Sequence, residues 1–512
     1  MTEYFYITTP IYYVNDVPHI GHAYTTLACD VLARFKRLDG YNVKFLTGTD
    51  EHGQKVAKSA ANAGITPQAF TDKVSQNFRD LCVLMNFSND DFIRTTESRH
   101  YRAAQALWEK LLARGEIYLD KYAGWYAVRD EAFYGEDELR DEGGKKIAPS
   151  GAECEWVEES SYFFRLSAWQ DRLLAFYEQH PDFIAPASRR NEVISFVKGG
   201  LKDLSVSRTT FAWGVPVPGD AKHIMYVWLD ALANYITALG YPDATAEMKN
   251  FWPTALHLIG KDILRFHAVY WPAFLMAAEL PNPRRIFANG WWMVEGQKMS
   301  KSLGNVIAPK TLVDTYGRDP VRYFLLREVP FGNDGDFSHT QMTARINSEL
   351  SNNIGNLVQR TLSFIQKNAG TAVPAPGAYQ PQDERLLNQI EQTLADTRGY
   401  LDRQEFHKAI EVILSLASAA NTYIDAEAPW SLKKTDPARM ATVLYVLCEI
   451  IRALGFLLLP FIPESAAKIL DAVAVPPAQR HYEFYGKKSA LAPGTPLPAP
   501  APIFPRYESK AA

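Results

Sequence analysis

Residues 4–40, "YFYITTPIYYVNDVPHIGHAYTTLACDVLARFKRLDG", change from one hydrophobic pattern to another at His19 and His22. Up to Tyr13 the stretch is an apolar run of aromatic and β-branched residues, which is typical of a buried strand. Beyond His22, apolar residues recur at helical spacing as far as Gly40, and this pattern predicts a helix that ends at the glycine. The stretch therefore predicts a strand, a turn that holds both histidines, and a helix.

The same order of elements returns further along the chain. Residues 42–53 ("NVKFLTGTDEHG") read as a strand that runs into a polar turn, and residues 255–278 ("ALHLIGKDILRFHAVYWPAFLMAA") as a strand followed by a helix. Such alternation predicts an α/β domain with a doubly wound, parallel, Rossmann-like sheet. Between Glu116 and Arg208, short aromatic strands and Gly-rich turns predict an inserted subdomain. The sheet should resume after it, near residues 207–218.

From about Thr340 the strand signals stop and long helical patterns follow, which predicts an all-α helical bundle. One of these patterns, residues 441–462, is apolar enough for a membrane span, but Glu449 and Arg452 lie in its middle and Pro460 breaks it. We interpret it as a buried bundle helix. The Pro/Ala-rich end of the chain is either an extended segment packed over the surface or a segment without fixed structure.

Composition limits the possible partners and the compartment. The 54 Lys and Arg against 58 Asp and Glu give a formal net charge of −4, so any nucleic-acid contact must rest on local basic patches. The four cysteines contain no Cys-x-x-Cys pair, which argues against a disulfide framework and against a cysteine zinc knuckle. The first residues show neither a basic region nor a signal cleavage site. We therefore expect a soluble, cytoplasmic protein with no membrane partner.

Two short motifs carry candidate chemistry. In "HIGH", His19 and His22 stand about one turn apart at the expected start of a helix, where free N–H groups favour an anion, and Gly21 would let a ligand approach the backbone. In "KMSKS", Lys298 and Lys301 lie three residues apart in a Gly-flanked loop, so that two cations could reach a triphosphate. Alone, the histidine pair is equally well explained as helix caps or packing residues, and the lysine pair is better explained as ordinary lysines of a solvated surface loop. Together, and in this order, they are far more specific.

The pair of motifs resembles the two signatures of class I aminoacyl-tRNA synthetases, and both match residue for residue. The rest of the chain resembles the methionyl-tRNA synthetases of that class, in "TPIYYVNDVPHIGHAYT", "FLTGTDEHG", "YVWLDALANY", "LIGKDILRFHAVYWPAFL", "GWWMVEGQKMSKSLGN", "NNIGNLVQR" and "AEAPW". The resemblance implies a methionine–tRNA ligase. Such an enzyme activates L-methionine with ATP and Mg²⁺, releases pyrophosphate, and passes methionine to the 3′ end of tRNA(Met), the initiator tRNA included.

The resemblance also implies which residues act. The residues expected in catalysis are His19, His22, Asp50, Arg208, Lys298 and Lys301. Those expected to bind ATP are His19, Gly21, His22, Lys298, Met299, Ser300, Lys301 and Ser302. Those expected around methionine are Ile11, Tyr13, Asp50, Trp228, Ala231, Leu232, Tyr235, Ile263, His267 and Trp271.

These assignments make physical sense for methionine. Asp50 would receive the substrate ammonium, and Arg208 would face the carboxylate or the adenylate. A thioether gains about 0.3–1.5 kcal/mol from an aromatic contact, and Tyr13 and His267 could offer donors to the sulfur. Taken alone, "YVWLDALANY" is better explained as an ordinary amphipathic core helix, and Asp50 is equally well explained as a helix cap.

In the helical half, Asn356 and Arg360 lie four residues apart on one helix face, and Trp430 follows Pro429 in "AEAPW". By resemblance these three bind the CAU anticodon of the tRNA, with Trp430 as the stacking platform. Without the resemblance, a bundle cap and a solvent-facing helix surface explain the same residues.

The chain departs from many methionyl enzymes in its insert. Ala127 stands where a cysteine zinc knuckle usually begins, and Cys154 is the only cysteine of the insert. We therefore expect no metal site and no structural zinc. Aromatic residues should hold the insert instead: Tyr122, Trp125, Tyr126, Phe133, Tyr134 and Trp156. The C-terminal tRNA-binding domain that makes some relatives dimers is also missing, which favours a monomer.

The patterns and the resemblance together divide the chain. We expect a catalytic domain in two halves (residues 1–115 and 208–297), an inserted connective subdomain (116–207), the KMSKS loop with a stem-contact linker (298–340), a helical anticodon-binding domain (341–465), and a C-terminal helix with the Pro-rich tail (466–512).

Two kinds of alternative remain on the sequence alone. The first is another class I synthetase. A cysteinyl enzyme needs a zinc site for which the cysteines are missing, and enzymes for leucine, isoleucine or valine carry an editing insert larger than this one. The second is a catalytically dead tRNA-binding protein of the same fold, against which the intact "HIGH" and "KMSKS" residues argue.

Overall fold

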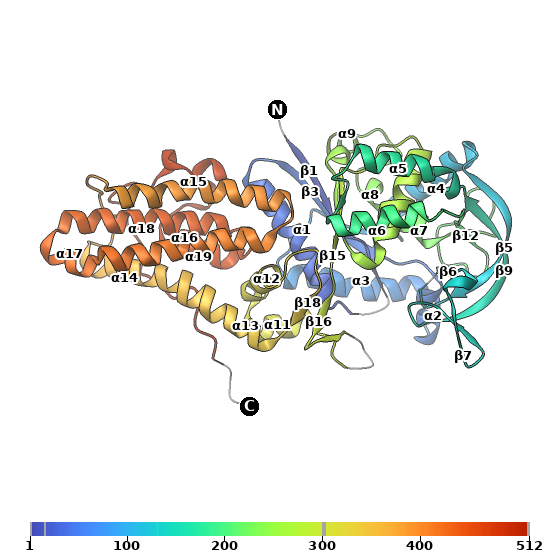
Figure 1. The fold of residues 1–512 in the computed structure, drawn as a ribbon, viewed down its shortest axis with the longest axis horizontal. Coiled ribbons are helices and arrows are strands. Elements are labelled where there is room, and N and C mark those ends of the chain that lie inside the picture. Colours follow the sequence, from blue (N-terminus) through green and yellow to red (C-terminus); the bar gives the residue numbers. More distant parts are fainter. Residues whose placement is uncertain (1–2, 15–16, 131, 300–303, 509–512) are drawn as a thin grey trace.

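The computed structural model describes residues 3–14, 17–130, 132–299 and 304–508 (Figure 1). A seven-stranded sheet, all of its described pairings parallel, forms the centre. Along the sheet its strands are β10 (Ile184–Ala185), β15 (Arg285–Asn289), β14 (Leu256–Gly260), β1 (Tyr4–Thr8), β3 (Asn42–Asp50) and β2 (Tyr12–Tyr13), with β4 (Asp91–Arg94) also paired to β3. The strands on one side of β1 (β2, β3 and β4) come first in the chain, and those on the other side (β10, β14 and β15) come later. This is the predicted doubly wound order, and such sheets bind ligands at the carboxyl ends of the strands beside the reversal point.

Alternate residues of β1 pack on opposite faces of the sheet. Phe5 and Ile7 join the core formed with α1 (Ile20–Leu38), whereas Tyr6 joins the core formed with α4 (Ser98–Ala113) and α10 (Trp271–Ala277). This period of two is what a strand covered on both faces requires. The core on the α1 side continues without a break into the helical bundle.

The insert is built on two long antiparallel strands, β5 (Ile117–Ala127) and β9 (Glu153–Phe164), which lie at the right of Figure 1. Four short strands complete it: β6 (Ala132–Tyr134), β7 (Arg140–Glu142), β8 (Lys145–Ile147) and β11 (Leu204–Ser205).

The chain returns to the large sheet earlier than the expected insert range of 116–207 suggests. After α5 (Gln170–Gln179) it enters β10, which pairs with β15, and α6 (Ala187–Lys198) follows. The predicted strand near residues 207–218 differs as well. There β12 (Ser207–Arg208) pairs only with β13 (Ile224–Met225), and the large sheet resumes at β14. Pro216 and Pro218 explain the difference, since proline cannot donate to a sheet ladder.

The end of the insert, where we expect no zinc knuckle, holds a small cluster with both apolar and polar members. Cys154 is buried with Ala127, and Trp125 meets Trp156 edge-on at 5.3 Å. The hydroxyl of Tyr134 donates to Asp130 at 2.9 Å. The described ranges contain no group of three or more His, Cys, Asp or Glu side chains placed to hold a metal ion. The side chains of Tyr122 and Phe133 lie outside the described part, and the absence of zinc remains a prediction.

The second half is the predicted helical bundle, at the left of Figure 1. Its helices are α14 (Asn356–Asn368), α15 (Pro381–Asp402), α16 (Phe406–Glu427), α17 (Pro429–Thr435), α18 (Pro437–Leu458) and α19 (Pro463–Ala472). It is joined to the sheet domain through α11 (Pro309–Tyr316), α12 (Arg318–Arg327), α13 (His339–Arg345) and the π-helical η6 (Ile346–Gly355). Helix α18 is the one described helix apolar enough to span a membrane, and 94% of its most apolar window is buried inside the protein.

The Pro-rich tail packs back over the bundle. Its Thr495 carbonyl accepts the N–H of Val373 at 2.9 Å, and Tyr507 exchanges two hydrogen bonds with the amide of Asn347 in η6. Of the two structures left open by the sequence, the extended surface segment is therefore the one observed up to residue 508.

Candidate functional site

His19 and His22 lie against each other at the start of α1. Their ring centroids are 3.9 Å apart, and His19 is the N-cap residue of the helix. Nδ1 of His19 accepts the backbone N–H of Gly21 at 3.1 Å, and Nδ1 of His22 accepts the backbone N–H of His19 at 3.1 Å. The two imidazoles thus form a capping box, a role more often played by Ser and Glu.

These capping bonds fix the tautomers of both rings. A ring nitrogen that accepts an N–H carries no proton, so each neutral imidazole holds its proton on Nε2. Burial and the charge of His19 hold the pKa of His22 well below its ordinary value. His22 is therefore a neutral N–H donor at physiological pH, which suits a phosphate oxygen.

The start of α1 differs from the expected row of free backbone donors. Ile20 N–H donates to the carbonyl of Ile307 at 3.1 Å, and His22 N–H donates to the carbonyl of His19 at 3.0 Å. Because Gly21 N–H is also used, an anion here would rest on the two imidazole Nε2–H groups. Gly21 is needed for another reason, since a Cβ at this position would lie 2.9 Å from Cε1 of the His19 cap.

Two aromatic rings pack against the imidazole of His22. Tyr12 meets its ring edge-on at 4.8 Å and Phe78 at 5.3 Å. The Tyr12 hydroxyl is fixed in turn by Thr26, one helical turn beyond His22, at 2.7 Å. The imidazole orientation is thus set by packing as well as by the cap.

The structure brings the residues expected around methionine to the carboxyl edge of the sheet. Ile11 and Tyr13 follow β1, Asp50 ends β3, and Ile263 follows β14. The other expected residues lie on short helices packed at this edge, namely Trp228, Ala231 and Leu232 on α7 (Val227–Leu232), Tyr235 on α8 (Asn234–Thr237), His267 in the π-helical η5 (Phe266–Tyr270), and Trp271 at the start of α10.

Six of these side chains, those of Ile11, Trp228, Leu232, Tyr235, Ile263 and Trp271, belong to one hydrophobic cluster or pack against it. Leu232, Tyr235 and Trp271 are almost fully buried in it, and Trp228 and Ile263 pack against it while still partly exposed. The ring of Trp228 stacks on Phe266 with centroids 3.4 Å apart. The wall formed in this way is aromatic and apolar, as an unbranched thioether requires.

His267 differs from its expected role as a donor to sulfur. Its Nδ1–H donates to the carbonyl of Ile263 at 2.9 Å, so that Nε2 accepts the hydroxyl of Tyr235 at 2.7 Å. Burial lowers its pKa to about 4, which keeps the ring neutral. Since both nitrogens are engaged, His267 orients Tyr235.

Asp50 and Arg208 are both buried. Asp50 is 8% exposed and pairs in register with Tyr13 of β2. The guanidinium of Arg208 lies 4.0 Å from the ring centroid of Tyr226, the N-cap residue of α7, and donates to Ser205 Oγ at 2.7 Å. Arg208 therefore supports the start of α7.

The KMSKS residues lie mainly beyond what can be described. β17 (Gln297–Lys298) pairs with β16 (Trp292–Val294), and Met299 packs against the core on the α1 side. Ser300, Lys301 and Ser302, together with the side chain of Lys298, lie outside the described residues. Their expected contacts with ATP stay predictions.

The three expected anticodon residues gather at the far end of the bundle. Asn356 begins α14 with an exposed side chain, and Arg360 follows one turn later. The Arg360 guanidinium lies 6.0 Å from the ring centroid of Trp430, which is 48% exposed, and donates to Asp425 at 2.5 Å. An exposed indole beside a guanidinium is the surface on which a base can stack.

Sequence reasoning missed a buried cluster next to α7. Asp230, within "YVWLDALANY", accepts hydrogen bonds from His52 and His100, each at 2.6 Å. The available signal was a carboxylate on the apolar face of a helix, which needs a buried partner.

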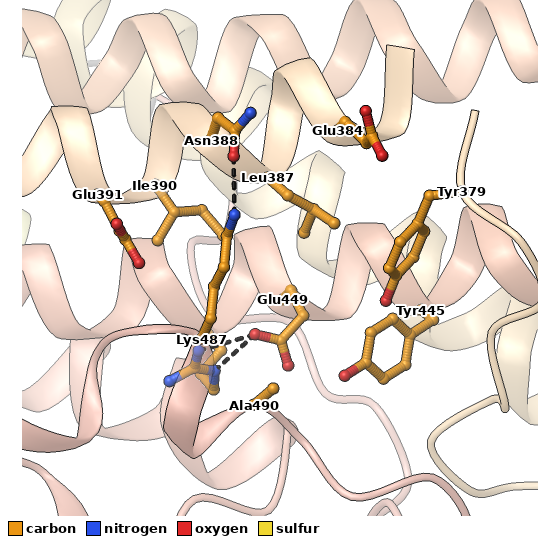
Figure 2. Close-up of a pocket in the computed structure, with 11 residues that line it drawn as sticks. Tyr379, Glu384, Leu387, Asn388, Ile390, Glu391, Tyr445, Glu449, Lys487 and Ala490 are labelled. Atoms are coloured by element: carbon orange, nitrogen blue, oxygen red, sulfur yellow. Dashed lines mark hydrogen bonds and ion pairs between the residues drawn. The ribbon is translucent and has the colours of Figure 1, made fainter. Parts of the chain in front are cut away.

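A cavity of about 440 Å³ lies elsewhere, between α15, α18 and the segment near Lys487 (Figure 2). Tyr379 and Tyr445 lie at one end of it, and Lys487 crosses to Asn388. It contains none of the expected site residues. Its buried carboxylate, Glu449, is already paired with Arg452 at 2.7 Å.

The doubly wound sheet, the histidine turn and the distant helical bundle define a class I tRNA synthetase. The family model "tRNA synthetases class I (M)" matches residues 5–362, and "Anticodon binding domain of methionyl tRNA ligase" matches residues 373–511. The chain belongs to the methionyl-tRNA synthetase family.

Individual relatives agree over the whole length. The chain is 56% identical to the "Methionine--tRNA ligase" of Brucella suis, covering 99% of this chain and 98% of that one, and 59% identical to that of Rickettsia felis, covering 99% of each. Among solved structures, Mycobacterium tuberculosis methionyl-tRNA synthetase in complex with methionyl-adenylate matches with a TM-score of 0.96 and 51% identity, covering 99% of this chain and 100% of that one. The free form of the same enzyme matches with a TM-score of 0.90 and 47% identity, covering 99% of each chain.

Proposed function

We propose that this chain is a methionine–tRNA ligase, which activates L-methionine with ATP and transfers it to the 3′ end of tRNA(Met), the initiator tRNA included. The observation that carries this conclusion is the match to methionine–tRNA ligases over 99% of the chain. The paired imidazoles at α1 and the aromatic wall at the carboxyl edge of the sheet supply the chemistry that the two substrates need.

In the first step the methionine carboxylate attacks the α-phosphorus of ATP, and pyrophosphate leaves. The nucleophile is ionised at pH 7, so no general base is required. The barrier is the negative charge that grows on phosphate oxygens, which positioned donors stabilise. We assign this role to the Nε2–H groups of His19 and His22, with Gly21 allowing the cap.

The remaining phosphate contacts come from the KMSKS loop. Lys298 and Lys301, with Met299, Ser300 and Ser302, would close over the β- and γ-phosphates of ATP, which enters as its Mg²⁺ complex. Loops of this kind complete a site only when substrate is bound.

For methionine, Asp50 would bind the ammonium group and the aromatic wall would hold the thioether. The hydrogen bond from Tyr235 to His267 fixes the position of the tyrosine hydroxyl. Ile11, Trp228 and Ile263 would contact the side chain. Selection is then by shape and by sulfur–aromatic contact.

In the second step the adenylate passes methionine to the terminal ribose, again without a protein nucleophile. Asn356, Arg360 and Trp430 would bind the CAU anticodon at the far end of the bundle. Stacking on Trp430 would contribute about 1–3 kcal/mol.

Several further properties belong to the same proposal. The chain acts as a cytoplasmic monomer with the domain division given above, except that β10 belongs to the large sheet, and its insert folds without zinc. Elemental analysis of protein purified without chelators checks the last point. Zinc near one atom per chain would overturn it.

The test of the function is ATP–pyrophosphate exchange without tRNA, with methionine, cysteine, leucine, isoleucine and valine compared in parallel. We expect exchange with methionine to exceed the others by at least about 10-fold to 200-fold, the range that pocket shape alone provides. Exchange with none of them would favour the dead tRNA-binding fold. Exchange that favours another amino acid would point to a different class I enzyme.

A further inference from the structure

Asp230 is a fully buried carboxylate on α7, the helix that also carries Trp228, Ala231 and Leu232. One of its oxygens lies 2.6 Å from Nδ1 of His52, and the other lies 2.6 Å from Nε2 of His100. The carboxylate accepts from both rings. We call these three residues the His–Asp–His cluster.

The cluster joins three separate elements of the fold. His52 lies in the turn after β3, two residues beyond Asp50, and His100 lies in the first turn of α4. Asp230 comes from α7, more than 120 residues further along the chain. Three elements that are distant in sequence therefore meet at one carboxylate.

Contacts on the outer sides of the two rings limit the imidazole orientations. Nε2 of His52 is 3.0 Å from the hydroxyl of Tyr101, and the ring is covered edge-on by Trp213 at 5.5 Å. On the other side, Nδ1 of His100 lies 3.5 Å from Oγ1 of Thr237 on α8. Because α8 also carries Tyr235, the cluster contacts two of the helices that form the aromatic wall, α7 and α8.

The charge on Asp230 favours the arrangement in which both imidazoles stay hydrogen-bonded to it. Burial raises the pKa of Asp230, but His52 and His100 outweigh it and bring the pKa to about 2. The carboxylate is therefore ionised at neutral pH. When a buried ionised group loses a partner, the folded protein is strongly destabilised. The cluster thus resists any movement of α7 away from β3.

From this geometry we infer that Asp230 is a positioning residue for methionine, which sets the distance between Asp50 and the aromatic wall on α7. The inference rests on the proposed function, since it presumes that Asp50 binds the ammonium group and that the wall binds the thioether. A substrate held at both ends is sensitive to the spacing of its two contacts. ATP, bound at α1 and the KMSKS loop, is not held by α7.

This role differs in its consequences from a purely structural one. A buried ionic cluster that only supports the core would change stability and leave the KM values for the two substrates in their original ratio. A positioning role raises the KM for methionine selectively, because only the methionine contacts are separated. The ratio of the two KM values is therefore the discriminating quantity.

The experiment measures ATP–pyrophosphate exchange on the full-length Asp230→Asn protein. The asparagine keeps the size of the side chain but presents an NH₂ group to one imidazole, which must shift its tautomer or move. We expect the KM for methionine to rise by about 10-fold or more, given that a misplacement of about 1 Å can cost 10²-fold. The KM for ATP should stay within about twofold of the parental value.

A matched control and a second variant complete the design. Asp319→Asn changes another buried carboxylate, which accepts the N–H of Ser465 at 2.6 Å, and it should leave both KM values unchanged. His100→Leu removes the imidazole that donates to Asp230 and offers no donor in its place, so it should give the same selective rise. This second variant keeps the test usable if Asp230→Asn does not fold. The inference is overturned if the Asp230 variant or the His100 variant folds and its KM for methionine stays within twofold of the parental value. Parental protein that does not exchange with methionine overturns the proposed function instead.

Discussion

Replacement of Arg322 by methionine should weaken the junction between the sheet domain and the helical bundle. The side chain is fully buried on α12, and its Nη2 pairs with Asp30 of α1 at 2.7 Å. Its remaining bonds go to three carbonyls, of Met85 at 3.0 Å and, in the turn between α18 and α19, of Pro460 at 3.0 Å and Phe461 at 2.9 Å. No other side chain donates hydrogen bonds in the planar arrangement that reaches these four acceptors.

The cost follows from the charge that the substitution leaves behind. Removal of one member of a buried ion pair typically costs about 3–5 kcal/mol, because the other charge stays buried. For a cooperative unit of about 200 residues, 1 kcal/mol lowers Tm by about 2–4 °C, so Arg322→Met should lower Tm by roughly 6–20 °C. Thermal unfolding followed by calorimetry measures this shift.

A double-mutant cycle tests whether the pair is the cause. Asp30→Asn alone leaves the Arg322 charge buried, whereas the double variant removes both charges, so the double loss should be smaller than the sum by about 2 kcal/mol or more. Lys310→Met removes an exposed pair with Asp314 and serves as the control, with an expected change within about 0.5 kcal/mol. The reasoning is refuted if Arg322→Met is no more destabilising than the control, or if the two losses add.

The same pair has a defined pH dependence. Burial raises the pKa of Asp30, but Arg322 and Arg34 lower it more, so that the net shift is downward. The stabilisation by this carboxylate is therefore present above its ordinary pKa and is lost as the pH falls through the lowered value. Without Arg322 the pKa of Asp30 should rise, because burial is then opposed only by Arg34 and Ser88, and protonation would relieve part of the buried charge. The gap in Tm between the variant and the parent should narrow from pH 7 to pH 5, and a constant gap would contradict this account.

Three other substitutions or conditions test the site. His22→Ala should lower the rate of ATP–pyrophosphate exchange by about 10²–10³-fold, the usual effect of losing one transition-state donor, and a loss below threefold would remove His22 from the phosphate site. Because the pKa of His267 is about 4, the imidazole stays neutral above that value, and the KM for methionine should be flat from pH 8 to pH 5.5; a rise centred near pH 6.5 would show an unshifted histidine. Trp430→Ala should reduce tRNA charging by about 5-fold to 150-fold, the equivalent of 1–3 kcal/mol of stacking, with exchange unchanged. Charging at the parental rate would show that the anticodon lies elsewhere.

The fold was predictable where the spacing of apolar residues matches the period of a strand or of a helix. The run from Tyr4 to Gly40 became β1, β2 and α1, since its apolar spacing changes from the strand period to the helix period at the two histidines. The stretch at residues 207–218 looked equally extended, but its prolines keep it out of the large sheet. Strand β10 was missed because two residues, Ile184 and Ala185, carry no period at all.

The site was predictable as a set of residues but not as a set of bonds. The motifs indicated His19 and His22, yet the cap that fixes their tautomers depends on backbone N–H groups whose partners only the fold decides. His267 likewise carries a partner on another helix, Tyr235, which no local pattern reveals. Asp230 shows the same limit, because both of its imidazoles come from distant elements.

The two halves of the site are held by different parts of the fold. Helix α1 carries the imidazoles at its start, the Asp30 pair in its middle, and at its end Asp39, whose carboxylate accepts Arg398 of the bundle at 2.6 Å. Nineteen residues of helix span about 28 Å at 1.5 Å each, so one stiff element joins the phosphate side of the site to the bundle. The methionine side is held by Asp230 to β3 and α4 instead.

This division separates the effects of the two buried ionic groups, the Arg322–Asp30 pair and the His–Asp–His cluster. A change at Arg322 loosens the support of α1, and should therefore alter the KM for ATP or the rate of exchange more than the KM for methionine. Asp230→Asn should do the reverse. If the two variants shift the same KM value in the same direction, α1 and α7 are not independent supports, and the site responds to either change as one unit.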